Sequence, residues 1–312
     1  MIDKINILFL GGAKRVSLAR RFIFSGRELN VDVEVFSYEL IKDVPFREIG
    51  KVIIGKKWTE KTILDHLYKV IKTYEVKIIL ANVDMATLVL SKLKDRFPSL
   101  NVITSDLSVS RIFLDKYIMY KECLSKNIKT IPLANHQYPK FAKLRNGSAS
   151  LGVKRLNNSK DEEIFFQSKN KSEYIIQKFI EGVEYTVDAY VDQNKRYIGA
   201  IPRIRMDIFG GESIKTKVIF DDEIILFSKK ILEKFDLIGP ITLQFIKRDN
   251  ELYFLELNPR FGGGVIASIE AGFNIPKIMM KDYLKLKIKK LKNYNSLIMT
   301  RYFKEVFHAV DN

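Results

Sequence analysis

The first hundred residues alternate short β-rich segments with amphipathic segments of helical period, and this alternation restricts the fold more than any other feature of the chain. Strands joined by helical crossovers form a parallel sheet with helices on both faces. The sequence therefore predicts a Rossmann-like α/β domain over residues 1–105. Its strands are expected at residues 5–10, 31–36, 51–54, 76–82 and 101–104, and its helical spacing is clearest at 63–74 and 90–97.

Residues 106–312 follow a different pattern, because most of their β-rich segments alternate apolar and polar residues as antiparallel strands do. Helices are expected at residues 111–126, after the capping residues 106–110, and at 224–235. No Pro/Gly/Ser-rich linker precedes this α+β region, so we expect it to pack closely on the first domain. Its strands are expected at residues 141–144, 174–179, 185–191, 197–202, 242–247 and 252–257.

The composition is that of a soluble globular protein, with 46% hydrophobic and 29% charged residues in a chain of 312. No segment has the roughly 18 consecutive apolar residues that a transmembrane helix needs. The single cysteine, Cys123, excludes an internal disulfide and fits a reducing compartment. We therefore expect a cytoplasmic protein without a transmembrane segment.

Lys and Arg outnumber Asp and Glu by 53 to 37, and the resulting net charge of +16 favours anionic ligands of any kind. The densest basic stretch, residues 281–292, is interpreted as a helix end and a strand with a solvated face. Binding of an anionic polymer or a membrane surface is the alternative. Because no zinc-binding spacing or aromatic RNA-binding motif accompanies the charge, we expect no dedicated nucleic-acid partner.

The turn Gly11-Gly12-Ala13-Lys14-Arg15 follows the first strand, where a dinucleotide-binding fold has its phosphate loop. It lacks the full glycine spacing of that motif, so a plain strand-to-helix turn is the favoured interpretation. An anionic substrate group bound at the helix N-terminus is the alternative.

The strongest chemical pattern lies at the end of the last predicted hairpin. Glu256 and Asn258 are two residues apart on a strand and therefore point to one face. Pro259 ends the strand pairing and leaves Arg260 on a loop, while Gln244 faces the pair from the other arm of the hairpin. Carboxylate and amide oxygens suit Mg²⁺, and the arginine can neutralise a phosphate.

Two further segments fit a nucleotide site. Lys143 at a strand end precedes the small-residue loop 146–152, an arrangement that can hold phosphates although it lacks P-loop spacing. The apolar strand 175–180 runs to Gly182, and a strand that leaves its pairing exposes backbone groups that can bind an adenine edge. Glu184 follows shortly and could hold ribose hydroxyls.

Together these features resemble the ATP-grasp superfamily, and within it the single-unit proteins similar to the large subunit of carbamoyl phosphate synthase. The resemblance covers essentially the whole chain and rests most on the Glu-x-Asn-Pro-Arg run at 256–260. It implies a pre-ATP-grasp domain (1–105) followed by an ATP-grasp domain (106–312), with a small lobe at about 130–176 and a large lobe at about 177–312.

The resemblance also assigns roles to individual residues. Arg260 and Lys143 would be catalytic, and Mg²⁺, with Mn²⁺ as an alternative, would be bound by Gln244, Glu256 and Asn258. The residues that would bind ATP are Lys116 and Lys143 at the phosphates, Gly147, Ser148, Ser150 and Gly152 in the glycine-rich loop, Gln177, Lys178, Phe179 and Ile180 at the adenine, and Glu184 at the ribose.

Members of this superfamily use Mg-ATP to convert a carboxylate into an acyl phosphate and join it to an amine or a thiol. Small-molecule carboxylate and amine substrates are therefore expected, and a homodimer is compatible. Arg203 and Arg205, on one strand face, would bind the substrate carboxylate, or else be exposed arginines of an edge strand. The alternative functions are a kinase-like ATP-grasp enzyme and a non-catalytic protein that binds a nucleotide or an anionic polymer.

Overall fold

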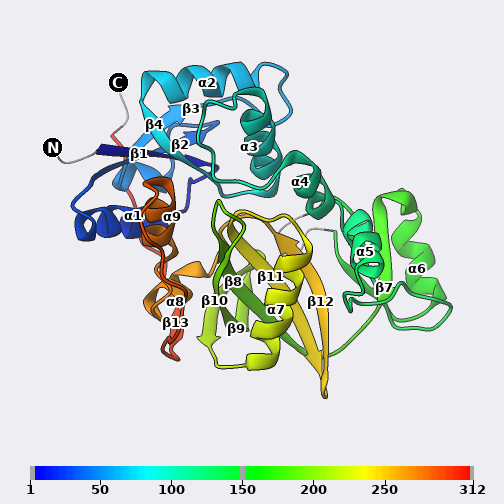
Figure 1. Ribbon diagram of the computed structural model, residues 1–312. Coiled ribbons are helices and arrows are strands. Elements are labelled where there is room, and N and C mark those ends of the chain that lie inside the picture. The colour runs from blue at the N-terminus through cyan, green and yellow to red at the C-terminus, as the bar shows by residue number, and fades with distance from the viewer. Residues whose placement is uncertain (1–3, 148–151, 310–312) are drawn as a thin grey trace.

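The computed structural model describes residues 4–147 and 152–309, and its strands form three separate sheets (Figure 1). The N-terminal sheet is parallel with the order β3-β2-β1-β4. Its strands are β1 (Lys4–Leu10), β2 (Asp32–Glu39), β3 (Lys51–Ile54) and β4 (Val76–Ala81), and the connecting helices are α1 (Val16–Glu28), α2 (Ile63–Thr73) and α3 (Asp84–Arg96).

Helices cover both faces of this sheet, as the alternating sequence predicts. Along β1, Phe9 packs with α1, whereas Leu8 and Leu10 pack with the buried faces of α2 and α3. The α/β prediction for the first domain is therefore confirmed.

One predicted strand and one predicted helix are wrong. Residues 101–104 form no strand, although Val102 and Ile103 are buried, because their apolar side chains face the core without a neighbouring strand to pair with their backbone. The helix expected at 111–126 is broken into α4 (Leu107–Leu114) and α5 (Lys116–Ser125). The break falls at Asp115, whose side chain caps α5 and whose backbone is extended.

A small antiparallel sheet, β6-β5-β7, follows α5. It consists of β5 (Lys140–Leu144), β6 (Lys154–Leu156) and β7 (Tyr174–Lys178), with α6 (Ser159–Phe166) alongside. Figure 1 shows this unit set apart from the larger sheet. Residues of β5 and β7 line one side of a cavity.

The largest sheet has the order β12-β11-β8-β9-β10-β13 and is covered on one side by α7 (Asp222–Lys234). The antiparallel hairpin predicted at its edge is present as β11 and β12. Its strands are β8 (Val183–Val191), β9 (Tyr197–Phe209), β10 (Glu212–Val218), β11 (Gly239–Arg248), β12 (Glu251–Asn258) and β13 (Ile298–Thr300).

The chain returns to the N-terminal sheet through α8 (Val265–Glu270) and α9 (Ile275–Tyr283). Their side chains share one hydrophobic core with β1 and α1, and the rings of Phe22 and Phe261 meet edge to face at 6.0 Å. This shared core holds the N-terminal sheet against the end of the largest sheet, where β12 terminates.

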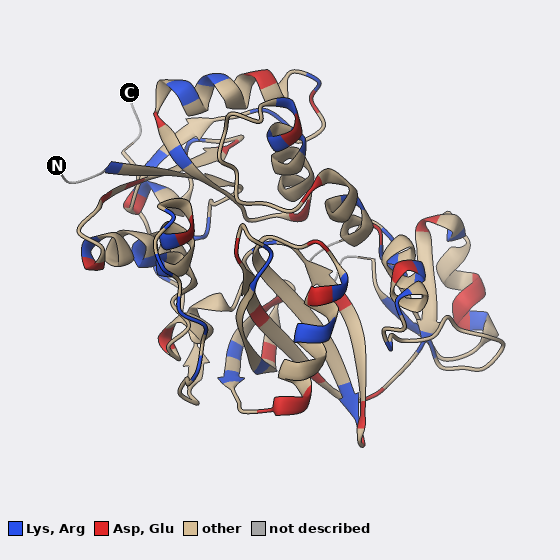
Figure 2. Cartoon of the chain, viewed as in Figure 1, with Lys and Arg blue, Asp and Glu red and all other residues tan. Residues whose placement is uncertain are grey.

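The basic segment after α9 has a solvated face, as predicted, although it is not a strand. Lys285, Lys287, Lys289, Lys290 and Lys292 are exposed, while Leu284, Ile288 and Leu291 pack against the core. Figure 2 shows Lys positions in blue along the segment between α9 and β13. Among the helices of the described residues, none combines the length and apolar character required to cross a bilayer.

Candidate nucleotide and acyl-transfer site

A cavity of about 530 Å³ lies where the three sheets approach one another. Its lining includes Gly11 and Asn82 of the N-terminal sheet, Lys143 and Gln177 of the small sheet, and Glu256 of the largest sheet. Of the described positions proposed from the sequence, all except Gly152 line this cavity, and their contacts define three regions along it.

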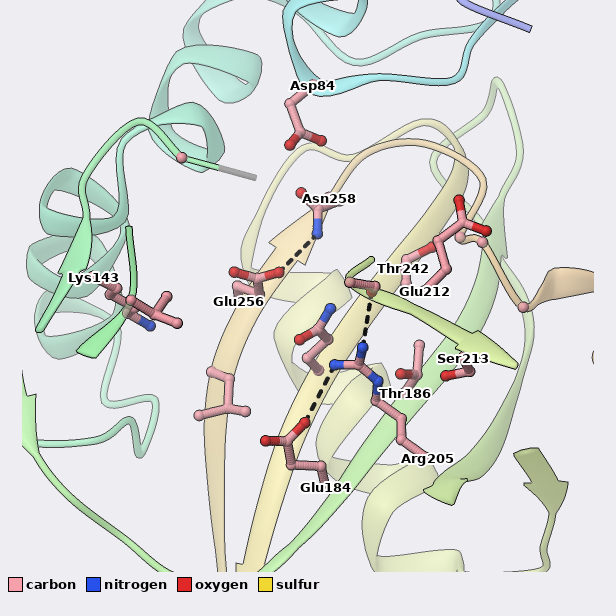
Figure 3. A pocket seen from close by; sticks show the side chains of 18 of the residues that line it. Asp84, Lys143, Glu184, Thr186, Arg205, Glu212, Ser213, Thr242, Glu256 and Asn258 are labelled. Carbon is pink, nitrogen blue, oxygen red and sulfur yellow. Dashed lines mark hydrogen bonds and ion pairs between the residues drawn. The ribbon is translucent and has the colours of Figure 1, made fainter. Parts of the chain in front are cut away.

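The middle region is built on the β11–β12 hairpin. Gln244 is the cross-strand partner of Glu256, and Asn258 lies two residues further along β12 on the same face. The Asn258 amide Nδ2 donates to Glu256 Oε1 over 3.3 Å, and Figure 3 shows both side chains directed into the cavity. This arrangement brings one carboxylate and two amide oxygens to one place.

These donors fit Mg²⁺ bound mainly by other ligands. No group of three His, Cys, Asp or Glu side chains in residues 4–147 and 152–309 could hold a metal by itself. Mg²⁺ commonly uses one or two carboxylates and takes its remaining oxygens from phosphates and water. The hairpin is therefore suited to a Mg²⁺ ion that arrives with a polyphosphate.

Two lysines lie across from the hairpin. Lys116 Nζ is 3.9 Å from Glu256 Oε2 and donates to the Gly147 carbonyl over 2.5 Å. Lys143 is buried on β5, and Figure 3 shows it on the far side of the cavity from Glu256. Burial lowers the pKa of Lys143 to about 8, against the raising effect of Glu256 and together with the lowering effect of Lys116. Lys116 and Lys143 thus provide two cationic groups that could bind a polyanion.

The contacts of Asp115 hold the neighbouring Lys116 at the edge of the cavity. Its carboxylate accepts from the Tyr117 and Ile118 amides and is gripped by Arg145, which follows β5. The break between α4 and α5 therefore ties the first residue of α5 to the small sheet. Of the glycine-rich loop, Gly147 and Gly152 lie at its two ends, while Ser148 and Ser150 lie outside the described residues.

The adenine region predicted at 177–180 lines the apolar end of the cavity, where Phe141, Ile131 and Leu255 also lie. The Gln177 side chain is buried and donates to the Ile131 carbonyl, so it supports the wall of the cavity. The backbone N–H groups of Lys178 and Phe179 donate to Pro132 and Pro139. Among the backbone hydrogen bonds of the described residues, none uses the Ile180 N–H.

Glu184, Arg203 and Arg205 each take part in an ion pair within the protein. Arg205 Nη1 lies 3.2 Å from Glu184 Oε2, the contact drawn in Figure 3, and Arg205 also donates to the Gly211 carbonyl. Arg203 is buried and ion-paired with Asp188 at 2.7 Å. Both arginines line the cavity, but each already holds a carboxylate.

The third region lies beyond the hairpin, toward the N-terminal sheet. Arg260 leaves β12 and pairs through Nε with Asp84 Oδ1 at 2.5 Å, which joins the largest sheet to the first residue of α3. Arg15 and Glu212 also line this region, with 3.7 Å between Arg15 Nη2 and Glu212 Oε1. Roles for Arg15, Asp84 and Glu212 do not follow from the sequence pattern, because their ion pairs join distant segments; Arg260 and Asp84, for example, are 176 residues apart.

Polar groups of the turn Gly11–Arg15 have hydrogen-bond partners within the protein. Burial raises the pKa of Glu39, while hydrogen bonds from Ser37 and from the Ala13 and Gly12 backbone lower it. The Glu39 carboxylate lies close to these two amides. Gly11, Ala13, Lys14 and Arg15 of the turn all line the cavity, so the plain-turn interpretation and its anion-binding alternative both stay predictions.

Residues 170–306 match the family described as ATP-grasp in the biosynthetic pathway with Ter operon. Over 128 residues, 38% of the chain, the sequence is 27% identical to the carbamoyl phosphate synthase large chain of Lachnoclostridium phytofermentans. The match spans only 12% of that relative's length.

Solved structures share the fold over nearly the whole chain. The N5-carboxyaminoimidazole synthetase of Staphylococcus aureus, complexed with ADP, has a TM-score of 0.76 and 18% identity, with 97% of this chain and 83% of that chain covered. The biotin carboxylase domain of the Hydrogenobacter thermophilus 2-oxoglutarate carboxylase, in complex with MgADP, ADP and bicarbonate, has a TM-score of 0.73 and 14% identity, covering 94% and 73%.

The chain has the fold of these synthetase and carboxylase structures, and its residues 170–306 are similar to an ATP-grasp family. Its sequence is further similar to a carbamoyl phosphate synthase large chain, so the resemblance drawn from the motifs is confirmed.

Proposed function

We propose that the protein is an ATP-dependent ligase that activates a carboxylate as an acyl phosphate and transfers the acyl group to an amine or a thiol. The observation that carries the proposal is the convergence of Lys116 and Lys143 on Glu256, Asn258 and Gln244 in one cavity. We further propose that residues 1–105 and 106–312 act as the two domains of the enzyme, with small and large lobes divided near residue 177.

The nucleotide would lie between the lobes. The Ile180 N–H would face the adenine, Glu184 would hold the ribose, and the ammonium groups of Lys116 and Lys143 would hold the phosphates. Mg²⁺ bound by Glu256, Asn258 and Gln244 would neutralise charge on the phosphate oxygens. The binding of ADP by similar structures supports this placement.

The acid would lie beyond the hairpin, where Arg260 can neutralise its carboxylate and the charge that develops on the transferred phosphoryl group. A carboxylate oxygen then attacks the γ-phosphorus and ADP leaves. The amine next attacks the carbonyl carbon, the C–O bond to phosphate breaks, and a proton is lost from the nitrogen. Closure of the glycine-rich loop would exclude water from the acyl phosphate.

A matched pair of variants tests this proposal. Glu256→Ala should reduce acid-dependent ADP release by at least about 100-fold, the usual cost of losing one electrostatic contact to the transition state. Glu251→Ala, at the exposed start of the same strand, is the control and should keep full turnover. Both variants should give the far-ultraviolet circular dichroism of the parent.

The assay is a screen of acid and amine pairs for ADP release, with the product mass read by mass spectrometry. ADP release that needs acid but no amine would indicate a kinase-like enzyme instead. Unchanged turnover in Glu256→Ala would remove the metal assignment, and no heat of binding with Mg-ATP would remove the ligase proposal.

A further inference from the structure

The third region of the cavity lies at a place where open parallel sheets bind ligands. The strand order β3-β2-β1-β4 reverses direction at β1, so the carboxyl ends of β1 and β4 flank the switch point of the sheet. Ligands of open α/β sheets bind in the crevice at such a point. The segments that follow these two strands, 11–15 and 82–84, both line the cavity.

Arginines from three distant segments meet here around one carboxylate. Arg301, which follows β13, holds Glu212 Oε2 at 2.6 Å and also donates to the Gly263 carbonyl. Arg15 approaches the other carboxylate oxygen of Glu212 only to 3.7 Å. Arg260, whose charge is close enough to affect both Arg15 and Glu212, is itself paired with Asp84.

Of these three arginines, Arg15 has the weakest partners. Its side chain is 13% exposed, and besides the distant Glu212 it donates to the Gly262 carbonyl over 3.3 Å. A guanidinium has five donor hydrogens, and burying a cation without full pairing is costly. Arg301 binds Glu212 through Oε2, while Glu212 Oε1 stays 3.7 Å from Arg15.

A second unpaired group faces the same crevice. Asn82 is 2% exposed, lines the cavity at the end of β4, and its side-chain oxygen has no hydrogen-bond partner among the described residues. Buried polar groups of this kind are normally satisfied, so an orphaned acceptor and an underpaired cation that line the same cavity indicate a ligand that brings both an anion and a hydrogen-bond donor.

We propose that Arg15 binds a second anionic group of the acid substrate, in addition to the carboxylate activated at Arg260, and that Arg301 is a positioning residue that keeps Glu212 off Arg15. The substrate class is therefore an acid with a further carboxylate or phosphate and a hydroxyl or amino donor near it. This inference rests on the proposed ligase function and specifies the acid that the site accepts.

The test is calorimetry of the full chain, saturated with Mg²⁺ and a non-hydrolysable ATP analogue, at constant ionic strength. The probes are glutarate, inorganic phosphate and butyrate. Glutarate or phosphate should bind at least tenfold more tightly than butyrate, and whichever binds better identifies a dicarboxylate or a phosphorylated acid. Equal binding of all three probes would overturn the inference.

The direction in which each variant changes the affinity for the anion also tests the inference. Arg15→Gln should weaken the preferred anion at least tenfold, whereas Glu212→Gln should tighten it by removing the competing carboxylate. Arg301→Gln should weaken it, but not in a Glu212→Gln background, because its effect acts through Glu212. If the ligand were instead bound through an ammonium group, Glu212→Gln would weaken its binding, and this result would overturn the inference.

Controls separate this inference from the proposed function. Arg248→Gln, at the exposed end of β11, should leave anion binding unchanged. If Arg15→Gln does not fold, Arg15→Lys keeps the charge and tests the bidentate geometry. If the parent fails to bind the ATP analogue, the ligase proposal fails; if it binds the analogue but Arg15→Gln binds anions normally, only the substrate inference fails.

Discussion

The buried Lys143 should make nucleotide affinity depend on pH. Its ammonium is out of water, and burial lowers its pKa to about 8 in the ligand-free protein. Phosphate oxygens placed against it would favour the charged form and return the pKa toward the ordinary value of 10.5. Binding of Mg-ATP above pH 8 must therefore take up a proton, and affinity should fall as pH rises.

The size of the effect follows from linkage between the two pKa values. With a pKa of about 8 free and about 10.5 bound, the dissociation constant should rise about 20-fold between pH 7.5 and 9.5, approaching tenfold per pH unit. Calorimetry in buffers of different ionisation enthalpy measures both the affinity and the number of protons taken up. Circular dichroism at each pH checks that the chain stays folded.

Substitutions at the same position decide whether Lys143 is the titrating group. Lys143→Arg remains charged throughout the range, so it should bind Mg-ATP with little dependence on pH. Lys143→Met should bind weakly at every pH. A pH dependence that persists in Lys143→Arg, or that is absent from the parent, would refute the reasoning.

Two further predictions concern stability, each measured by urea unfolding with Asp249→Asn, in an exposed turn of positive φ that asparagine tolerates, as the control. Asp115→Ala should cost about 1–3 kcal/mol, because it removes the cap of α5 and the partner of Arg145 together; a loss no larger than the control would contradict the capping role. Asp188→Ala should cost about 3–5 kcal/mol by leaving Arg203 buried without its partner. The double replacement Asp188→Leu with Arg203→Met should recover much of that loss, and equal destabilisation of both would count against the charge explanation.

Local patterns were sufficient for the parallel sheet and for the β11–β12 hairpin. The alternation of strand and helix needs no knowledge of distant residues, and Glu256 and Asn258 share a face because they lie two apart on a strand. The same local patterns misplaced residues 101–104, since burial of Val102 and Ile103 resembles that of a strand whether or not a neighbour pairs with it. The strand β10 was not predicted. It pairs with the part of β9 that runs seven residues beyond Pro202, where the apolar run of β9 ends.

The third region of the cavity depends on contacts that no local pattern contains. Arg15, Glu212 and Arg301 become neighbours only when the first strand, the β9–β10 hairpin and the segment after β13 are brought together. Asp115 caps α5 locally, and Arg145, thirty residues away, also holds its carboxylate. Sequence reasoning assigned the nucleotide to one hairpin and two short segments and the acid to Arg203 and Arg205, and both assignments stay predictions.

The glycines at 262–264 connect the two ends of the site. A side-chain carbon added at Gly264 would lie 2.4 Å from Arg203 Nη1, and one at Gly262 would lie 2.9 Å from Asp188 Oδ1. At Gly263 it would meet the Glu212 carboxyl carbon at 2.8 Å. The loop therefore passes close to the Arg203–Asp188 pair and to Glu212. The run of three glycines fits this packing, because a side-chain carbon at each of the three positions would come within 3 Å of one of these side chains.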